Sequence, residues 1–260
     1  MSSLIPKKRI GNLLTRREML RLTGATAVAS LVGSAHGEAI SQGQTTAPSQ
    51  AASASLTGAP SCVVRPQQTE GPYFVDDRLN RSDIRSDPSD SSVSAGVPLS
   101  LVFHVSRIDG ATCKPISGAI VDLWQCDAFG IYSDFRDFNG YFDTRGKKFL
   151  RGFQTTDAGG KAQFLTIYPG WYLGRTVHIH FKIRTNPASQ RGSEFTSQLY
   201  FDDLITDQVH AQAPYNTRGQ RRQRNDRDRI FRGGGKDLML QLTKDREGYV
   251  GKFDIGLRLA

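Results

Sequence analysis

Two histidines separated by one residue are the clearest candidates for metal chemistry in this sequence. His178 and His180 alternate with apolar neighbours, which is the pattern of a β-strand with one buried face. Alternate side chains of a strand point to the same side, so the two imidazoles can bind one ion. Tyr172, six residues before His178, is close enough to supply a third ligand from a preceding turn, and Tyr132 is a candidate fourth.

Four blocks of the sequence resemble the intradiol ring-cleavage dioxygenases of the protocatechuate and catechol type. The blocks lie at 69–74 (TEGPYF), 118–132, 168–181 and 198–201 (QLYF), and their order and spacing cover about residues 61–232. Each block alone is a weak signal, but the four together are specific. The resemblance implies a non-haem Fe(III) site held by the residues Tyr132, Tyr172, His178 and His180.

The resemblance also implies a reaction and roles for nearby residues. The expected enzyme cleaves a small aromatic diol with O2 between its two hydroxylated carbons, giving a cis,cis-muconate-type diacid. Tyr172 is expected to act as a base, Arg175 to stabilise negative charge on the ring, and Gln198 to pair with Arg175. Tyr73 and Trp171 are expected near the substrate. Two phenolates favour Fe(III) over Fe(II), because a trivalent cation offsets the cost of deprotonating tyrosine.

Two other functions are compatible with the residues alone. An exported β-sandwich module could bind aromatic or sugar ligands without turning them over, which would need surface aromatics but no set of four ligands. A copper or zinc enzyme could use His178 and His180, because His-x-His strands occur in such proteins. Iron content and oxygen uptake distinguish the dioxygenase from both alternatives.

The elements that must position these residues are strands. The 260-residue chain has 26 glycines and 11 prolines, and amphipathic runs of helix length are scarce after residue 40. Strands are expected at 99–106, 120–125, 162–167, 177–183, 197–200, 238–242 and 249–257, separated by Gly and Asn/Asp turns. His210 falls in an expected loop. We therefore predict an all-β protein, a β-sandwich of the intradiol dioxygenase type with long loops, formed as one domain by residues 61–260.

The N-terminal residues have the pattern of an export signal. Arg16 and Arg17 lie in a twin-arginine-like motif, followed by a short apolar run and then small residues, so 1–37 is expected to direct export to the periplasm or the extracellular space. Residues 38–60, rich in Ser, Gln, Thr and Ala, are expected to be a disordered linker. The apolar run is too short to span a bilayer, so no stable membrane association is expected after signal removal.

The net charge of +9 does not by itself indicate a nucleic-acid partner. Six basic residues lie in 1–37, and many of the rest lie in 218–236, where acidic residues interrupt the run and no nucleic-acid-binding motif surrounds it. We expect a solvated loop there, at a subunit contact if the chain forms a homo-oligomer. Of the three cysteines, Cys126 is expected to be a buried thiol, and Cys62 and Cys113 are candidates for a disulfide.

Overall fold

The computed structural model describes residues 63–137, 140–185 and 193–259, all of which belong to one compact unit formed by residues 56–260. The predicted export signal, the predicted linker and Cys62 lie outside the described residues. Cys113 is disulfide-bonded and Cys126 is a buried free thiol. The pairing of Cys62 with Cys113 therefore stays a prediction. No helix within the described ranges is long and apolar enough to cross a membrane.

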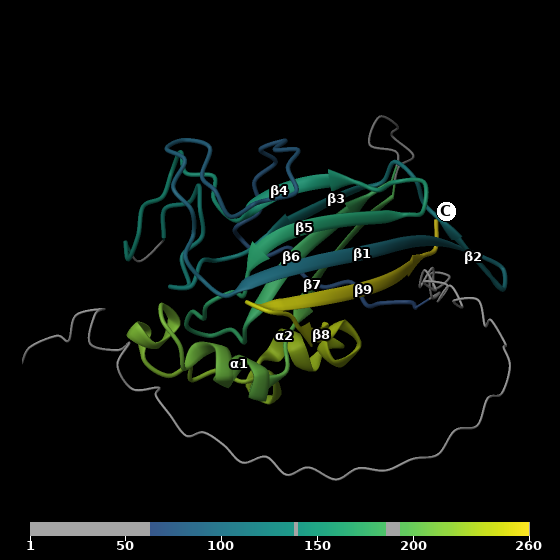
Figure 1. Cartoon of the computed structure of the whole chain (residues 1–260). Coiled ribbons are helices and arrows are strands. Elements are labelled where there is room, and N and C mark those ends of the chain that lie inside the picture. Colours follow the sequence, from purple (N-terminus) through teal and green to yellow (C-terminus); the bar gives the residue numbers. More distant parts are fainter. Residues whose placement is uncertain (1–62, 138–139, 186–192, 260) are drawn as a thin grey trace, which may run out of the picture. The chain divides into compact units, whose positions relative to one another are not determined.

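Two β-sheets form a sandwich, as predicted (Figure 1). In the first sheet β1 pairs with β5 and β2 along one edge and with β9 along the other, and β8 pairs with β9. The second sheet has the order β4-β3-β6-β7. The strands are β1 (Pro98–Asp109), β2 (Thr112–Pro115), β3 (Ile120–Trp124), β4 (Arg151–Thr155), β5 (Lys161–Ile167), β6 (His178–Arg184), β7 (Glu194–Tyr200), β8 (Gln241–Lys244) and β9 (Tyr249–Leu257).

The main core lies between the sheets and follows from the alternation of each strand. β1 sends every second side chain inward, from Leu99 to Val105, and all of these are buried. Phe103, Phe181 and Phe253 meet at the centre, with ring centroids 5.3 to 5.7 Å apart. Aromatic rings in such tilted contacts bury large apolar areas, which makes them a main source of stability.

Several element boundaries differ from the sequence prediction. The strand expected at 238–242 is shifted: β8 begins at Gln241, and Gly235–Leu238 form a 3-10 turn. β2 and most of β4 were not predicted, because both are short and lack a clear apolar alternation. His210 is not in a loop but ends helix α1 (Asp203–His210), and it is buried.

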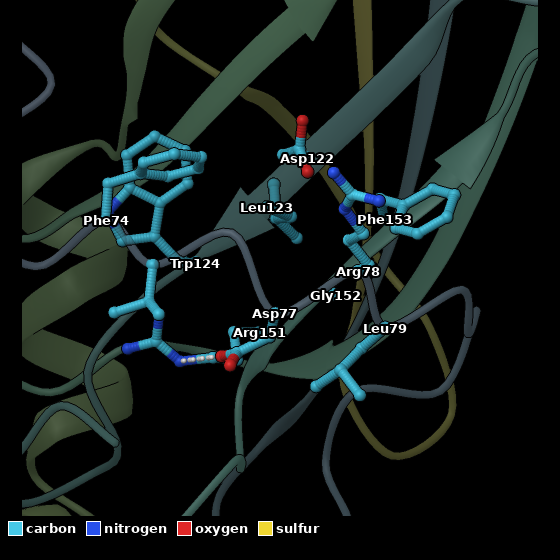
Figure 2. Close-up of a pocket in the computed structure, with 11 residues that line it drawn as sticks. Phe74, Asp77, Arg78, Leu79, Asp122, Leu123, Trp124, Arg151, Gly152 and Phe153 are labelled. Carbon is cyan, nitrogen blue, oxygen red and sulfur yellow. Dashed lines mark ion pairs between the residues drawn. The ribbon is translucent and has the colours of Figure 1, made fainter. Parts of the chain in front are cut away.

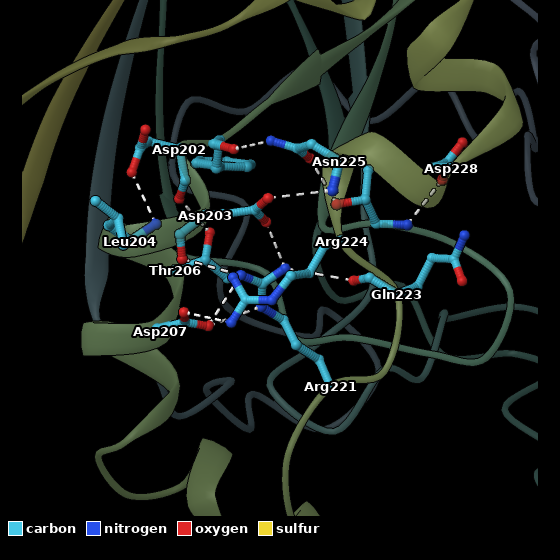
Figure 3. Close-up of polar contacts among 12 residues, drawn as sticks. Asp202, Asp203, Leu204, Thr206, Asp207, Arg221, Gln223, Arg224, Asn225 and Asp228 are labelled. Carbon is cyan, nitrogen blue, oxygen red and sulfur yellow. Dashed lines mark hydrogen bonds and ion pairs between the residues drawn. The ribbon is translucent and has the colours of Figure 1, made fainter.

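The arginine-rich segment forms short helical turns and stays largely exposed to solvent. It contains 3-10 turns at Tyr215–Arg218 and Asn225–Arg227 and a short helix α2 (Arg229–Arg232), which lie with α1 on one side of the sheets (Figure 1). Arg221 is buried and bonds Asp203 at 2.5 Å and Asp207 at 2.9 Å on α1, and Arg224 bonds Asp207 at 2.7 Å (Figure 3). The expected loop is therefore partly helical, and carboxylates of α1 bury Arg221. The other six arginines of the run are exposed to solvent, as expected.

Candidate metal centre

Strand β6 brings the two predicted histidines together on its outer face. His178 and His180 are both buried, and their Nε2 atoms lie 3.0 Å apart. Nδ1 of His178 lies 2.7 Å from the carbonyl oxygen of Thr176, so this nitrogen is the one that donates its proton. Nε2 of His178 then carries the lone pair, which accepts from neighbouring donors here and could bind a metal ion instead. This is the arrangement by which a backbone carbonyl orients a metal-binding imidazole.

Two loops bring the two predicted tyrosines to the same place. Oη of Tyr172 lies 3.1 Å from Nε2 of His178, and Oη of Tyr132 is buried without a hydrogen-bond partner among the described residues. The Tyr132 loop is held by Asp127, whose carboxylate accepts bonds from the backbone of residues 129 and 131. Gly130 has φ +77° and a Cβ there would lie 2.2 Å from the carbonyl oxygen of Trp171, so the two loops pack too closely for a side chain.

The electrostatics of these four groups are compatible with a bound metal ion. Burial lowers the pKa of His178 and His180 well below the ordinary value, so both imidazoles are neutral and able to act as ligands. Burial raises the pKa of Tyr132 and Tyr172 well above the ordinary value, so only a strong nearby positive charge would make them phenolates. Two neutral nitrogen and two potential phenolate donors with unsatisfied atoms suit Fe(III).

A metal ion at the two histidines would need tyrosine ligands. Within the ranges that the structure describes, no group of three or more His, Cys, Asp or Glu side chains could hold a metal ion. The two histidines therefore require the phenol oxygens to complete a ligand set.

Aromatic residues surround the four groups. Tyr73 stacks on Tyr132 with ring centroids 4.1 Å apart, so it lies beside the candidate ligands, as predicted for a residue near the substrate. Trp124 stacks on His180 at 5.1 Å and 8°. Sequence reasoning did not single out Trp124, although it shares the outer face because β3 pairs Trp124 directly with His180. Trp171 is partly buried, and the guanidinium of Arg218 lies 5.2 Å from its ring.

Arg175 lies against the centre, with Nη1 3.3 Å from Nε2 of His178. Its Nη2 donates to Oε1 of Gln198 at 2.6 Å, so the predicted pairing of these residues is present. Its Nε donates to Asp228 at 2.8 Å, a contact that no sequence pattern indicated because the residues are 53 positions apart. The structure thus brings together Tyr73, Tyr132, Tyr172, Arg175, His178, His180 and Gln198, and adds Trp124 and Asp228. Trp171 packs against the main core instead, with Arg218 over its ring.

Two hollows differ in what they can hold. A groove of about 590 Å³ is lined by Gln68, Thr69, Arg175, Asp228 and Arg229, among others, which is a size suited to a small organic ligand. A cavity of about 10 Å³ lies beneath Phe74 and Trp124, where Asp77 pairs with Arg151 (Figure 2). The second has room for about one water molecule. The groove reaches the candidate ligands only through Arg175, because none of the four lines it.

Comparison with known proteins gives one consistent family. A model of the "Dioxygenase" family matches residues 69–241. The chain is 29% identical to catechol 1,2-dioxygenase 1 of Acinetobacter lwoffii over 165 residues, covering 54% of this chain and 49% of that protein. It thus spans about half the length of this curated relative.

Two solved structures are also similar. An intradiol ring-cleavage dioxygenase from Tetranychus urticae has a TM-score of 0.65 and 32% identity, covering 76% of this chain and 95% of that one. The dioxygenase domain of a dioxygenase carbohydrate-binding protein fusion from Streptomyces sp. SirexAA-E has a TM-score of 0.53 and 31% identity, covering 76% of this chain and 99% of that one.

Proposed function

Because this chain belongs to the intradiol ring-cleavage dioxygenase family, we propose that it is a non-haem Fe(III) enzyme that cleaves catechol-type diols. The bond between the two hydroxylated carbons breaks, and both atoms of O2 enter the product, a cis,cis-muconate-type diacid. The observation that carries the proposal is the convergence of His178 Nε2, His180 Nε2 and Tyr172 Oη within 3.0 to 3.1 Å.

The four candidate ligands divide into fixed and movable groups. Tyr132, His178 and His180 are almost wholly buried, whereas Tyr172 is partly exposed and lies in a loop. Fe(III) held by these residues would bind the two hydroxyl oxygens of the diol and make the ring reactive toward O2. As an iron-bound phenolate, Tyr172 would be the group that accepts a proton from an incoming hydroxyl.

Arg175 and the surrounding rings would bind and stabilise the substrate. The guanidinium of Arg175 lies between His178 and the groove, where it can stabilise the negative charge that grows on the ring during cleavage. Tyr73 offers a flat apolar surface next to Tyr132 and Tyr172, which suits an aromatic ring and excludes water. The partners are thus a small aromatic diol and O2, and the chain carries all four ligands whether it acts alone or as a homo-oligomer.

A visible absorption spectrum of the purified, metal-analysed protein tests the proposal. We expect a broad tyrosinate-to-Fe(III) band that shifts when catechol is added without oxygen, followed by ring cleavage when oxygen is admitted. Protein that stays colourless after addition of ferric iron would refute the ferric reading, and would favour a binding module or another metal.

We also propose that the protein is exported by the twin-arginine route to the periplasm or beyond. The support is the pair Arg16-Arg17 before a short apolar run. Replacing both arginines by lysine should keep the protein in the cytoplasm in a cell-fractionation experiment. Unchanged export of that variant would count against this route.

A further inference from the structure

We propose that Asp228 is a positioning residue that aims Arg175 at the metal centre, an inference that rests on the function proposed above. The Asp228 side chain is fully buried. Its Oδ2 accepts bonds from Arg175 Nε at 2.8 Å and from the backbone of Thr176 at 2.7 Å. Its Oδ1 accepts bonds from the backbone of Ile230 at 2.7 Å and Phe231 at 3.0 Å. One carboxylate thus joins the start of α2 to the loop that carries Arg175.

Asp228 also closes a ring of contacts around the groove. Arg175 Nη2 donates to Gln198 Oε1 at 2.6 Å, and Tyr200 Oη lies 3.0 Å from that same oxygen and 2.7 Å from Gln68 Oε1. Gln68 Nε2 then donates to the carbonyl oxygen of Ile230 at 2.9 Å, in the helix that Asp228 caps. Asp228 and Gln198 therefore hold Arg175 directly from two distant parts of the chain, and Tyr200 and Gln68 link Gln198 to the helix that Asp228 caps.

The geometry of the guanidinium shows what Asp228 contributes. Gln198 accepts a hydrogen bond from Nη2 of Arg175. With that bond alone, the planar guanidinium group could still rotate about Nη2. Asp228 holds the Nε edge, so the third corner, Nη1, is fixed 3.3 Å from His178 Nε2. The negative charge of Asp228 also offsets the cost of burying the cation, so Arg175 gains less by turning into the groove.

Asp202 provides a matched comparison within the same chain. It caps α1 as Asp228 caps α2, accepting bonds from the backbone of Leu204 at 2.8 Å and Ile205 at 3.2 Å. Asp228 differs by its full burial and by its contacts with Arg175 and with the backbone of Thr176, whereas Asp202 is exposed. Asp202→Asn therefore measures the loss of a helix cap, and the Arg175→Ala background isolates the guanidinium contact.

The test compares Asp228→Asn with Asp202→Asn in the full, iron-loaded protein. We expect Asp228→Asn to lower kcat/KM for catechol about 10- to 100-fold, because small misplacements of a positioned group cost rates of that order, while Asp202→Asn changes it less than about twofold. In the Arg175→Ala background, Asp228→Asn should cause no further loss. An equal loss with and without Arg175 would overturn the inference, as would wild-type activity of Asp228→Asn.

A second measurement does not depend on turnover. In metal-free, 15N-labelled protein, the Nε–H of Arg175, assigned by its loss in Arg175→Ala, should exchange slowly with water. Exchange should accelerate at least tenfold in Asp228→Asn and stay unchanged in Asp202→Asn. Unchanged protection in Asp228→Asn would overturn the inference. If Asp228→Asn does not fold, Asp228→Ser, which keeps a cap acceptor, takes its place with the same expectations. A wild-type protein that cleaves no diol would refute the proposed function, while this measurement would still test the contact.

Discussion

Both faces of strand β6 are buried, but one carries apolar side chains and the other carries polar ones. Ile179, Phe181 and Ile183 point into the core between the sheets, where apolar side chains surround them. His178, His180 and Lys182 point the other way and are also buried, each less than one tenth exposed. A sheet face turned away from the core would ordinarily meet water, so something else must cover it.

The cover is the segment that precedes β1. Glu70 pairs with Lys182 at 2.5 Å, and the Lys182 ammonium lies 4.0 Å from the centre of the Phe74 ring. Further along the same face, Arg184 pairs with Asp122 at 2.9 Å and with Asp76 at 3.2 Å. The outer face is therefore held by ion pairs and rings, whereas the inner face is held by close apolar packing.

The two faces of β6 also differ in the number of buried polar atoms that lack a hydrogen-bond partner. Near the metal centre, Nδ1 of His180, Oη of Tyr132 and Nε1 of Trp124 are buried and unpaired among the described residues. Each such atom costs free energy of folding, of order 1 to 3 kcal/mol. The inner face of β6 thus contributes stability, whereas the surroundings of the outer face lose some of it to unpaired polar atoms. Of these three atoms only Oη of Tyr132 is a candidate metal ligand.

The largest effect is expected from Tyr132→Phe. This change removes a candidate ligand, so we expect loss of the visible band and of detectable turnover. It also removes a buried hydroxyl that has no partner, so the metal-free variant should unfold with a free energy about 1 kcal/mol higher than the metal-free parent. Iron analysis and denaturant unfolding measure the two outcomes. A variant that keeps iron and colour would show that Tyr132 is not a ligand.

Phe181→Ala tests the opposite face of the same strand. Phe181 is fully buried between Phe103 and Phe253, so truncation should lower the free energy of unfolding by about 3 to 5 kcal/mol. The iron-loaded variant should keep the position of the visible band below its melting temperature, because no ligand has changed. If the band moved as much as in a ligand variant, the two faces would not be separable.

Acid titration tests the ion pairs of the outer face. Burial raises the pKa of Asp122 from its ordinary value of 3.8 to about 6, against the opposing effect of Arg184. The folded protein then binds a proton more tightly than the unfolded chain, so this contribution to stability is present below about pH 4. It is lost as pH rises through 6, by at most about 3 kcal/mol. Unfolding measured from pH 4 to 7 should show this decline in the parent and not in Asp122→Asn. Parallel pH profiles would contradict the raised pKa.

Features of the fold and of the candidate site that depend on neighbouring residues in the sequence could be predicted. Contacts between residues far apart in the sequence could not. The His-x-His alternation indicates both faces of β6, and the sandwich follows from the spacing of strands and turns. The pairing of Trp124 with His180 depends on the register between β3 and β6, and the contact of Asp228 with Arg175 depends on a folded segment 53 residues away. Neither register nor long-range packing is encoded in local periodicity, so these two residues required the structure.

Gly71→Ala is expected to have the smallest combined effect on stability and activity. It tests the contact between the segment that precedes β1 and His180 of the candidate site. Gly71 has φ +74°, and a Cβ there would lie 3.1 Å from Cε1 of His180. The unfavourable backbone conformation should lower the free energy of unfolding by about 1 to 2 kcal/mol. The contact should also push His180 by tenths of an ångström, shifting the visible band and lowering kcat. Gly146→Ala is the matched control, with φ +84° and no atom within 4 Å of its Cβ, so it carries the backbone cost alone. Equal spectra and equal kcat in both variants would show that a side chain at position 71 can be accommodated without moving His180.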